Sequence, residues 1–218
     1  IWPEAKEMTR SQLKVCGITR EKDGYEALST GASFIGFILY AGSPRCIAPN
    51  EAHKLWAKIK RSGTFSVAVE VDPSPARLRE IDKFGFDFIQ LHFPCSIKLE
   101  TVSEWAEISG AGRLWLAPRI SPQDSFPDEL LPYADSFLID AYDEAKFGGT
   151  GLSSDWERFS QWKNKYPEKK WILAGGIGPE NLENALSKTA PDIIDVNSSV
   201  EKKPGLKNHD KLKKISSF

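Results

Sequence analysis

Cys16 and Asp140 are the two residues whose chemistry and spacing suggest acid–base catalysis. Each ends a short apolar run, KVC and FLID, and the ends of parallel barrel strands gather at one rim. A carboxylate at the rim of an apolar interior is partly desolvated, which raises its pKa and suits Asp140 to donate a proton near neutral pH. Cys16 lies beside Gly17 and near Lys14, where its thiol can ionise and act as a base or nucleophile. The structural alternatives are a buried core residue for Cys16 and a loop cap for Asp140.

Two loops late in the chain predict a phosphate site. Gly175 and Gly176 follow an apolar run in AGGIGPEN, and Ser198 and Ser199 in NSSVE are typical of the first turn of a short extra helix. Glycines let backbone N–H groups approach an anion closely, and a helix N-terminus adds a favourable dipole. The alternative is a tight turn at the glycines with serines that only cap a helix.

Two further residues are candidates for substrate binding. Arg45, in SPR, either pairs through two hydrogen bonds with a ligand carboxylate or is a solvated loop arginine. His92 ends an apolar run and contacts either a ligand or a neighbouring carbonyl. Tyr40 is assigned no role, and Cys46 and Cys95 are interpreted as structural. The segment GGTG at Gly148–Gly151 is interpreted as flexible and able to close over a ligand.

Eight short, nearly continuous apolar runs must position these residues. They are Leu13–Cys16, Phe34–Tyr40, Phe65–Val71, Phe86–His92, Arg113–Ala117, Asp135–Asp140, Trp171–Ala174 and Asp192–Val196. Continuous rather than alternating apolar runs favour parallel strands covered on both faces. Dividing 218 residues by eight gives about 27 per unit, close to the ~30 residues of a βαβ unit. The sequence therefore predicts an α/β fold, a single (β/α)8 TIM barrel with short loops, with residues 1–12 as an N-terminal extension and 13–218 as the barrel.

Helix signals separate the apolar runs. Asn50 is expected to cap one helix, Pro75 to begin another, and Pro179 to occupy the first turn of a third. The helix expected within residues 121–133 is the weakest, because three prolines crowd that segment.

Composition limits the classes of partner. There are 29 Lys and Arg against 30 Asp and Glu, so the net charge of -1 gives no general attraction to nucleic acid or an anionic membrane. The longest clean apolar run, FIGFILY, is far short of the roughly 18 residues of a membrane span, and the first residues lack a signal-peptide core. Three cysteines and three histidines without metal-ligand spacing predict a reducing, cytoplasmic setting, with no disulfide framework and no metal.

Several segments in order along the chain carry a resemblance to a known family. They are KVCGIT (Lys14–Thr19), GFILYAGSPR (Gly36–Arg45), IQLH (Ile89–His92), FLID (Phe137–Asp140), GGTG (Gly148–Gly151), LAGGIGPENL (Leu173–Leu182) and DVNSSVEKKPGLKN (Asp195–Asn208). Together they resemble the phosphoribosylanthranilate isomerases of tryptophan biosynthesis, over residues 14 to about 208.

The resemblance implies a cofactor-free Amadori rearrangement of N-(5-phosphoribosyl)anthranilate to 1-(2-carboxyphenylamino)-1-deoxyribulose 5-phosphate. It implies that Asp140 is the general acid, with a raised pKa, and that Cys16 is the general base, with a lowered one. Arg45 would hold the anthranilate carboxylate, and His92 would contact the substrate. The phosphate would be held by backbone groups of Gly175, Gly176, Ser198 and Ser199. A monomer or homodimer acting on this small phosphorylated substrate is expected.

The sequence departs from the family's pattern at three places. After IQLH the family commonly has glycine and an acidic residue, whereas Phe93-Pro94-Cys95 follows here. The third strand commonly ends in VFV, whereas it ends in Val69-Glu70-Val71 here, and Ser199 stands where glycine is frequent. The first two lie near the rim and bear on substrate fit. Two alternatives stay open: an aminoaldose isomerase barrel of the kind acting in histidine biosynthesis, with paired aspartates and two phosphate sites, and a barrel that binds a phosphorylated ligand without catalysis.

Overall fold

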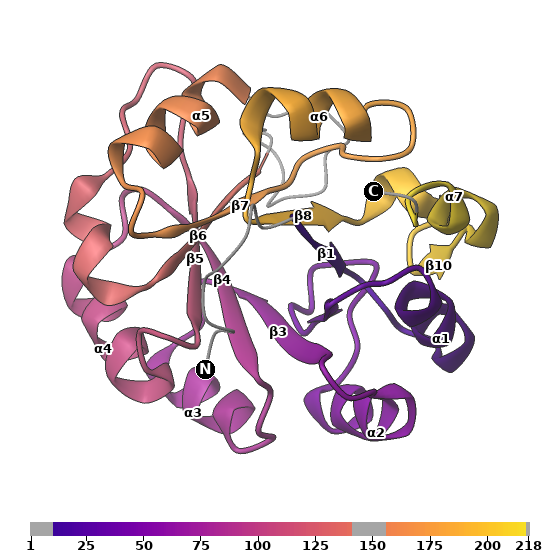
Figure 1. Cartoon of the computed structure of the whole chain (residues 1–218). Helices are drawn as coiled ribbons and strands as arrows, with labels where there is room; N and C mark the ends of the chain where they lie inside the picture. The colour runs from indigo at the N-terminus through magenta and orange to yellow at the C-terminus, as the bar shows by residue number, and fades with distance from the viewer. Residues whose placement is uncertain (1–10, 141–155, 217–218) are drawn as a thin grey trace.

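Eight parallel strands close into a barrel in the computed structural model, which describes residues 11–140 and 156–216 (Figure 1). The strands are β1 (Gln12–Val15), β2 (Phe34–Ile38), β3 (Phe65–Val71), β4 (Phe88–Pro94), β5 (Leu114–Arg119), β6 (Ser136–Ile139), β7 (Lys170–Leu173) and β8 (Ile193–Val196). Each strand pairs with the next, and β1 closes the ring against β8 with Lys14 opposite Asp195. The predicted (β/α)8 barrel is confirmed.

Helices surround the barrel on its outside (Figure 1). They are α1 (Glu21–Ser29), α2 (Pro49–Ile59), α3 (Pro75–Asp82), α4 (Leu99–Ser109), α5 (Trp156–Lys165), α6 (Leu182–Thr189) and α7 (His209–Lys214). Between β5 and β6 the chain forms a 3-10 helix, η1 (Asp128–Tyr133), with Pro132 inside it. After β8 come a second 3-10 helix, η2 (Ser198–Val200), and a hairpin of β9 (Glu201–Lys203) and β10 (Leu206–Lys207). The weak helix and the short extra helix therefore both lie where they were predicted.

Two predicted helix starts are wrong. The helix α2 begins at Pro49, and Ala48 in the capping position makes no side-chain cap, so Asn50 lies inside the helix. Proline is favoured at a first helical position because its missing N–H would be unpaired there anyway. The helix α6 begins only at Leu182, which leaves Pro179 in the preceding turn. By contrast, α3 begins at Pro75 as predicted, with the Ser74 hydroxyl accepting a hydrogen bond from the Arg77 amide.

Alternating residues of each strand build two separate cores. Phe34, Phe88 and Trp115 meet inside the barrel with ring centroids 5.1 to 5.7 Å apart. A larger cluster fills the layer between the barrel and its helices, where Ile35 and Trp171 are fully buried. Because both faces of each strand are covered, the strands are apolar almost throughout. The inner cluster also contains Cys16, which places the thiol against the packed barrel interior.

Candidate active site

A cavity lies at the carboxyl ends of the strands. Its empty space is about 680 Å³, with the open solvent at its mouth included. All eight predicted site residues line it: Cys16, Arg45, His92, Asp140, Gly175, Gly176, Ser198 and Ser199. Other lining residues were not predicted to act there, including Tyr40, Gln90 and Asp195. The structure thus brings the predicted residues together, and their individual roles stay predictions.

Cys16 is positioned by a close approach between two strands. It directly follows β1, its amide donates to the Val196 carbonyl at 2.9 Å, and the residue is only 3% exposed. A Cβ added to Gly36 of β2 would lie 2.7 Å from the Cys16 Sγ and 3.0 Å from its Cα. Glycine at position 36 is therefore what leaves room for the thiol.

The electrostatics of Cys16 differ from the prediction. Burial raises the pKa of the thiol, and the positive charges of Lys14 and Lys207 only partly oppose this effect. The direction is opposite to the expected lowering, because burial of Cys16 against the inner core outweighs the charges of the two lysines. A raised pKa makes the thiolate a stronger base once it has formed.

A buried polar network lies beside the thiol. Lys14 is fully buried, and its Nζ donates to Asp195 Oδ2 at 2.7 Å and to Gln90 Oε1 at 2.6 Å. Burial acts to lower the pKa of Lys14, but the neighbouring Asp195 and Cys16 raise it, so the ammonium stays charged. Sequence reasoning used Lys14 but missed Gln90 and Asp195. Their signal was a polar residue inside an apolar strand, which is costly to bury without a partner.

His92 completes this network as a neutral side chain. Burial, together with the charge on Lys14, lowers the pKa of His92 to about 3. Its Nε2 lies 2.7 Å from Gln90 Nε2. Because Gln90 Oε1 accepts from Lys14, the Gln90 amide nitrogen is the donor, His92 Nε2 accepts, and the proton of His92 is assigned to Nδ1. His92 can therefore donate a hydrogen bond near the cavity without carrying charge.

The two loops predicted to bind phosphate are packed together. Gly175 and Gly176 have φ angles of 89° and 69°, a backbone conformation that favours glycine. The side chain of Asn181 accepts from the Gly178 amide at 2.9 Å and donates to the Gly176 carbonyl at 3.0 Å. The Ser199 hydroxyl donates to the Ile177 carbonyl, which joins the two loops.

The amides of these loops are available to a ligand. In the part of the chain that the structure describes, the backbone N–H groups of Gly175, Gly176, Ser198 and Ser199 donate no hydrogen bond. All four residues line the same cavity, so their N–H groups can bind an anion there.

Asp140 follows β6 at the same rim and is half-buried. The segment Gly148–Gly151, predicted to close over a ligand, lies outside the described residues.

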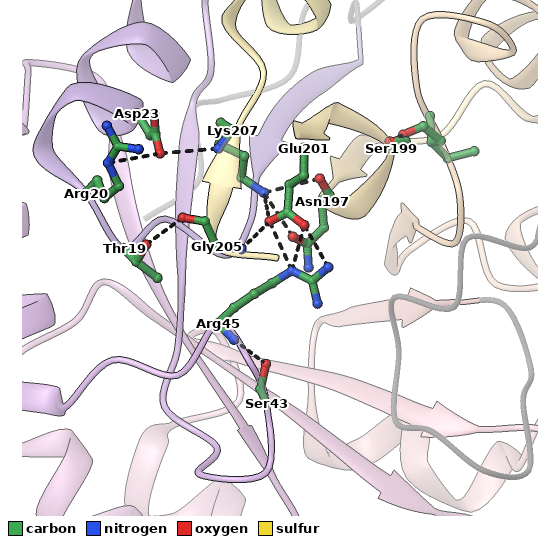
Figure 2. Close-up of polar contacts among 11 residues, drawn as sticks. Thr19, Arg20, Asp23, Ser43, Arg45, Asn197, Ser199, Glu201, Gly205 and Lys207 are labelled. Atoms are coloured by element: carbon green, nitrogen blue, oxygen red, sulfur yellow. Dashed lines mark hydrogen bonds and ion pairs between the residues drawn. The ribbon is translucent and has the colours of Figure 1, made fainter. Parts of the chain in front are cut away.

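Arg45 is held in place rather than solvated. It lies in the loop between β2 and α2, and its side chain is 13% exposed. Its Nε lies 3.0 Å from both carboxylate oxygens of Glu201, and its Nη2 lies 2.7 Å from Glu201 Oε2 (Figure 2). The alternative of a solvated loop arginine is therefore wrong. Sequence reasoning missed Glu201, because only the tertiary fold brings position 201 beside position 45.

The residues that depart from the family's pattern near strands three and four, Glu70 and Phe93-Pro94-Cys95, are not among the described residues that line the cavity. Val69 and Val71 line it, whereas Glu70 pairs with Arg77 of α3 at 3.2 Å. Phe93 is fully buried and packs edge-on against Trp105 of α4, with ring centroids 5.4 Å apart. The effect of these departures on substrate fit stays a prediction.

The described ranges, 11–140 and 156–216, contain neither a cluster of metal-binding side chains nor a membrane-spanning helix. No group of three or more His, Cys, Asp or Glu residues there is arranged to hold a metal ion. No helix in those ranges is long and apolar enough to span a bilayer.

Fold and site together define a (β/α)8-barrel enzyme with a candidate acid and a candidate base in one cavity. A protein-family model described as N-(5'phosphoribosyl)anthranilate (PRA) isomerase matches residues 13–217. The chain belongs to this family, and it is an isomerase.

Individual relatives agree with this assignment. The N-(5'-phosphoribosyl)anthranilate isomerase of Gloeothece citriformis is 34% identical over 212 residues, which cover 94% of this chain and 91% of the relative. The dimeric phosphoribosylanthranilate isomerase of Thermotoga maritima, solved as monomers, has a TM-score of 0.74 at 26% identity, over 94% of this chain and 96% of that one. A solved isomerase in complex with reduced 1-(o-carboxyphenylamino)-1-deoxyribulose 5-phosphate has a TM-score of 0.71 at 25% identity, over 95% and 97% of the two chains.

Proposed function

We propose that the chain converts the aminoaldose N-(5'-phosphoribosyl)anthranilate to the ketose 1-(2-carboxyphenylamino)-1-deoxyribulose 5-phosphate, with Asp140 as general acid and Cys16 as general base. The observation that carries this proposal is the meeting of eight predicted residues, from the ends of six strands, in one cavity. Membership of the isomerase family supports the reaction, which belongs to tryptophan biosynthesis.

The chemistry needs only one acid and one base. Asp140 protonates the ribose ring oxygen, the bond from that oxygen to C1 breaks, and the nitrogen lone pair forms a protonated Schiff base. The Cys16 thiolate then removes the C2 proton, and the freed electron pair forms a C1–C2 double bond as the C–N double-bond electrons return to nitrogen. The resulting enolamine gains a proton at C1 and loses its C2 hydroxyl proton to give the ketone. Hydrogen and electrons balance within the substrate, so the proposed steps need no redox cofactor.

Ligand binding is divided among the remaining residues. The amides of Gly175, Gly176, Ser198 and Ser199, which donate no hydrogen bond within the described ranges, can bind the phosphate. Arg45 can pair with the anthranilate carboxylate. Neutral His92 is placed to hydrogen-bond the substrate. These contacts explain how a chain with a net charge of -1 can bind a dianionic phosphate and a carboxylate without a basic surface.

The proposal also covers the domain boundaries, the cellular setting, the oligomeric state and the partners of the chain. We place residues 1–12 as an N-terminal extension and 13–218 as the barrel domain, although β1 itself begins at Gln12. We propose a cytoplasmic enzyme that works as a monomer or homodimer and has neither nucleic acid nor membrane as a partner. A solved family member described as dimeric supports the homodimer.

Turnover tests the proposal directly. The purified chain should consume N-(5'-phosphoribosyl)anthranilate, measured as loss of anthranilate fluorescence, and Cys16→Ala and Asp140→Ala should each lower kcat by at least about 100-fold. Cys95→Ala is a matched control, because this exposed thiol lies outside the cavity lining. Wild-type turnover by both catalytic-site variants would refute the assigned roles. Ligand binding by calorimetry, with no product by mass spectrometry, would support a barrel that binds without catalysis.

A further inference from the structure

Arg45 presents two different edges, and Glu201 occupies only one of them. A guanidinium has five N–H donors, and its Nε and Nη2 groups form a side edge while Nη1 and Nη2 form an end edge. Glu201 takes the side edge through contacts of 3.0 Å to Nε and 2.7 Å to Nη2. Figure 2 shows the third guanidinium nitrogen pointing away from Glu201. The end edge therefore keeps the paired donors that a second carboxylate needs.

Glu201 is itself fixed by a buried cation. Lys207 is fully buried, and its Nζ donates to Glu201 Oε1 at 3.0 Å and to Asn197 Oδ1 at 3.0 Å. The Gly205 amide donates to the same Glu201 oxygen at 3.1 Å. Burial acts to raise the pKa of Glu201, but Arg45 and Lys207 outweigh it and lower the pKa, so the carboxylate stays ionised.

The hairpin that carries Glu201 and Lys207 is tied to the loop after β1 and to α1. The Thr19 hydroxyl donates to the Gly205 carbonyl at 2.8 Å, and the Lys207 amide donates to Asp23 Oδ2 at 3.3 Å (Figure 2). The stem of Arg45 also has little room, because a Cβ on Gly17 would lie 2.9 Å from its Cδ. The long side chain of Arg45 is therefore already ordered, and it loses little rotamer freedom when a ligand binds.

From these contacts we infer that Glu201, held by Lys207, is a positioning residue that fixes Arg45 with its end edge toward the cavity and so determines recognition of the substrate's carboxylate-bearing ring. This inference rests on the proposed function. It assigns Glu201 no contact with the reacting atoms. Loss of Glu201 should weaken binding of the substrate's carboxylate and leave the phosphate loops and the acid–base pair in place.

A pair of ligands separates this role from a structural one. The first is the reduced product analogue, and the second is the same compound with a phenyl ring that lacks the carboxylate. Calorimetry should show the first ligand binding about 10-fold more weakly to Glu201→Gln than to the wild type, with the second ligand unchanged within about 2-fold. In turnover, KM should rise by about 10-fold while kcat stays within about 3-fold. Glu51→Gln, which breaks an exposed ion pair with Lys54, is the matched control and should leave the affinity for both ligands unchanged.

A double-mutant cycle completes the test. Once Arg45→Ala has removed the guanidinium, adding Glu201→Gln should weaken the first ligand no further. Lys207→Met should also weaken binding of the first ligand and leave binding of the second unchanged. Circular dichroism and thermal melting confirm that this variant is folded. Equal weakening of both ligands, or full additivity in the cycle, would overturn the inference while leaving the isomerase assignment intact. Absence of turnover in the wild type would instead refute the proposed function.

Discussion

Adding one methyl group at position 36 should impair the site without replacing a polar residue, by crowding Cys16 and, at 3.1 Å, the Cε of Lys14. The Cβ of Gly36→Ala would lie 2.7 Å from the Cys16 Sγ, whereas ordinary contacts begin at 3.4 Å. Either the thiol or the backbone of β1 must therefore move, because the second close atom, at 3.0 Å, is the Cys16 Cα. The displacement is about 0.7 Å, and a misplacement of ~1 Å in a catalytic group can cost about 100-fold in rate.

The same substitution also overpacks the barrel interior. Extra methylene groups in a packed core cost about 1–3 kcal/mol. At roughly 2–4 °C per kcal/mol for a chain of this size, Tm should fall by about 2–12 °C. We expect kcat to fall by about 10- to 100-fold and KM to change little, because the phosphate loops and Arg45 lie elsewhere on the rim.

A matched glycine makes the experiment decisive. A Cβ on Gly112 would come no closer than 3.6 Å to Asp135 Oδ2, so Gly112→Ala adds the same atom without crowding. Fluorescence turnover and thermal melting should find Gly112→Ala close to the wild type and Gly36→Ala impaired in both. Wild-type kcat for Gly36→Ala would refute the claim that the thiol's position controls the reaction.

Two further predictions concern the acid–base pair and the phosphate loops. Burial raises the pKa of Cys16, and the base must be a thiolate. We therefore expect kcat/KM to rise with pH through the neutral range and to be still rising at pH 8. A plateau of kcat/KM at pH 8 would instead indicate a thiol with a lowered pKa. Gly178→Ala would place its Cβ 2.7 Å from the Ser199 Cβ and separate the two loops, so we expect KM to rise by about 10-fold with a smaller change in kcat. An unchanged KM would show that the packing of the two loops is unimportant for binding.

The architecture was predictable because burial on both faces leaves a continuous apolar signal. Eight such runs correspond to the eight strands, and strand ends at a common rim led to Cys16, His92 and Asp140. Helix starts were harder, because a local signal competes with nearby residues of similar propensity. Pro49 rather than Asn50 begins α2, and α6 starts after Pro179 has formed a turn.

The electrostatics of the site depended on contacts that the sequence does not reveal. The pKa of Cys16 is set by burial among residues from several strands, so the motif around it predicted the wrong direction. The partner of Arg45, Glu201, lies 156 positions away in the chain. Lys207 is a buried lysine in a short lysine-containing stretch, which by composition alone is typical of a solvated turn.

The most direct test of the central claim is a crystal structure of this chain with reduced 1-(2-carboxyphenylamino)-1-deoxyribulose 5-phosphate. We expect the Cys16 Sγ and the Asp140 carboxylate to flank the sugar, with Asp140 within about 3.2 Å of the hydroxyl derived from the ring oxygen. We expect the phosphate to bind the amides of Gly175, Gly176, Ser198 and Ser199. A sugar bound beyond the reach of both Cys16 and Asp140 would contradict the account.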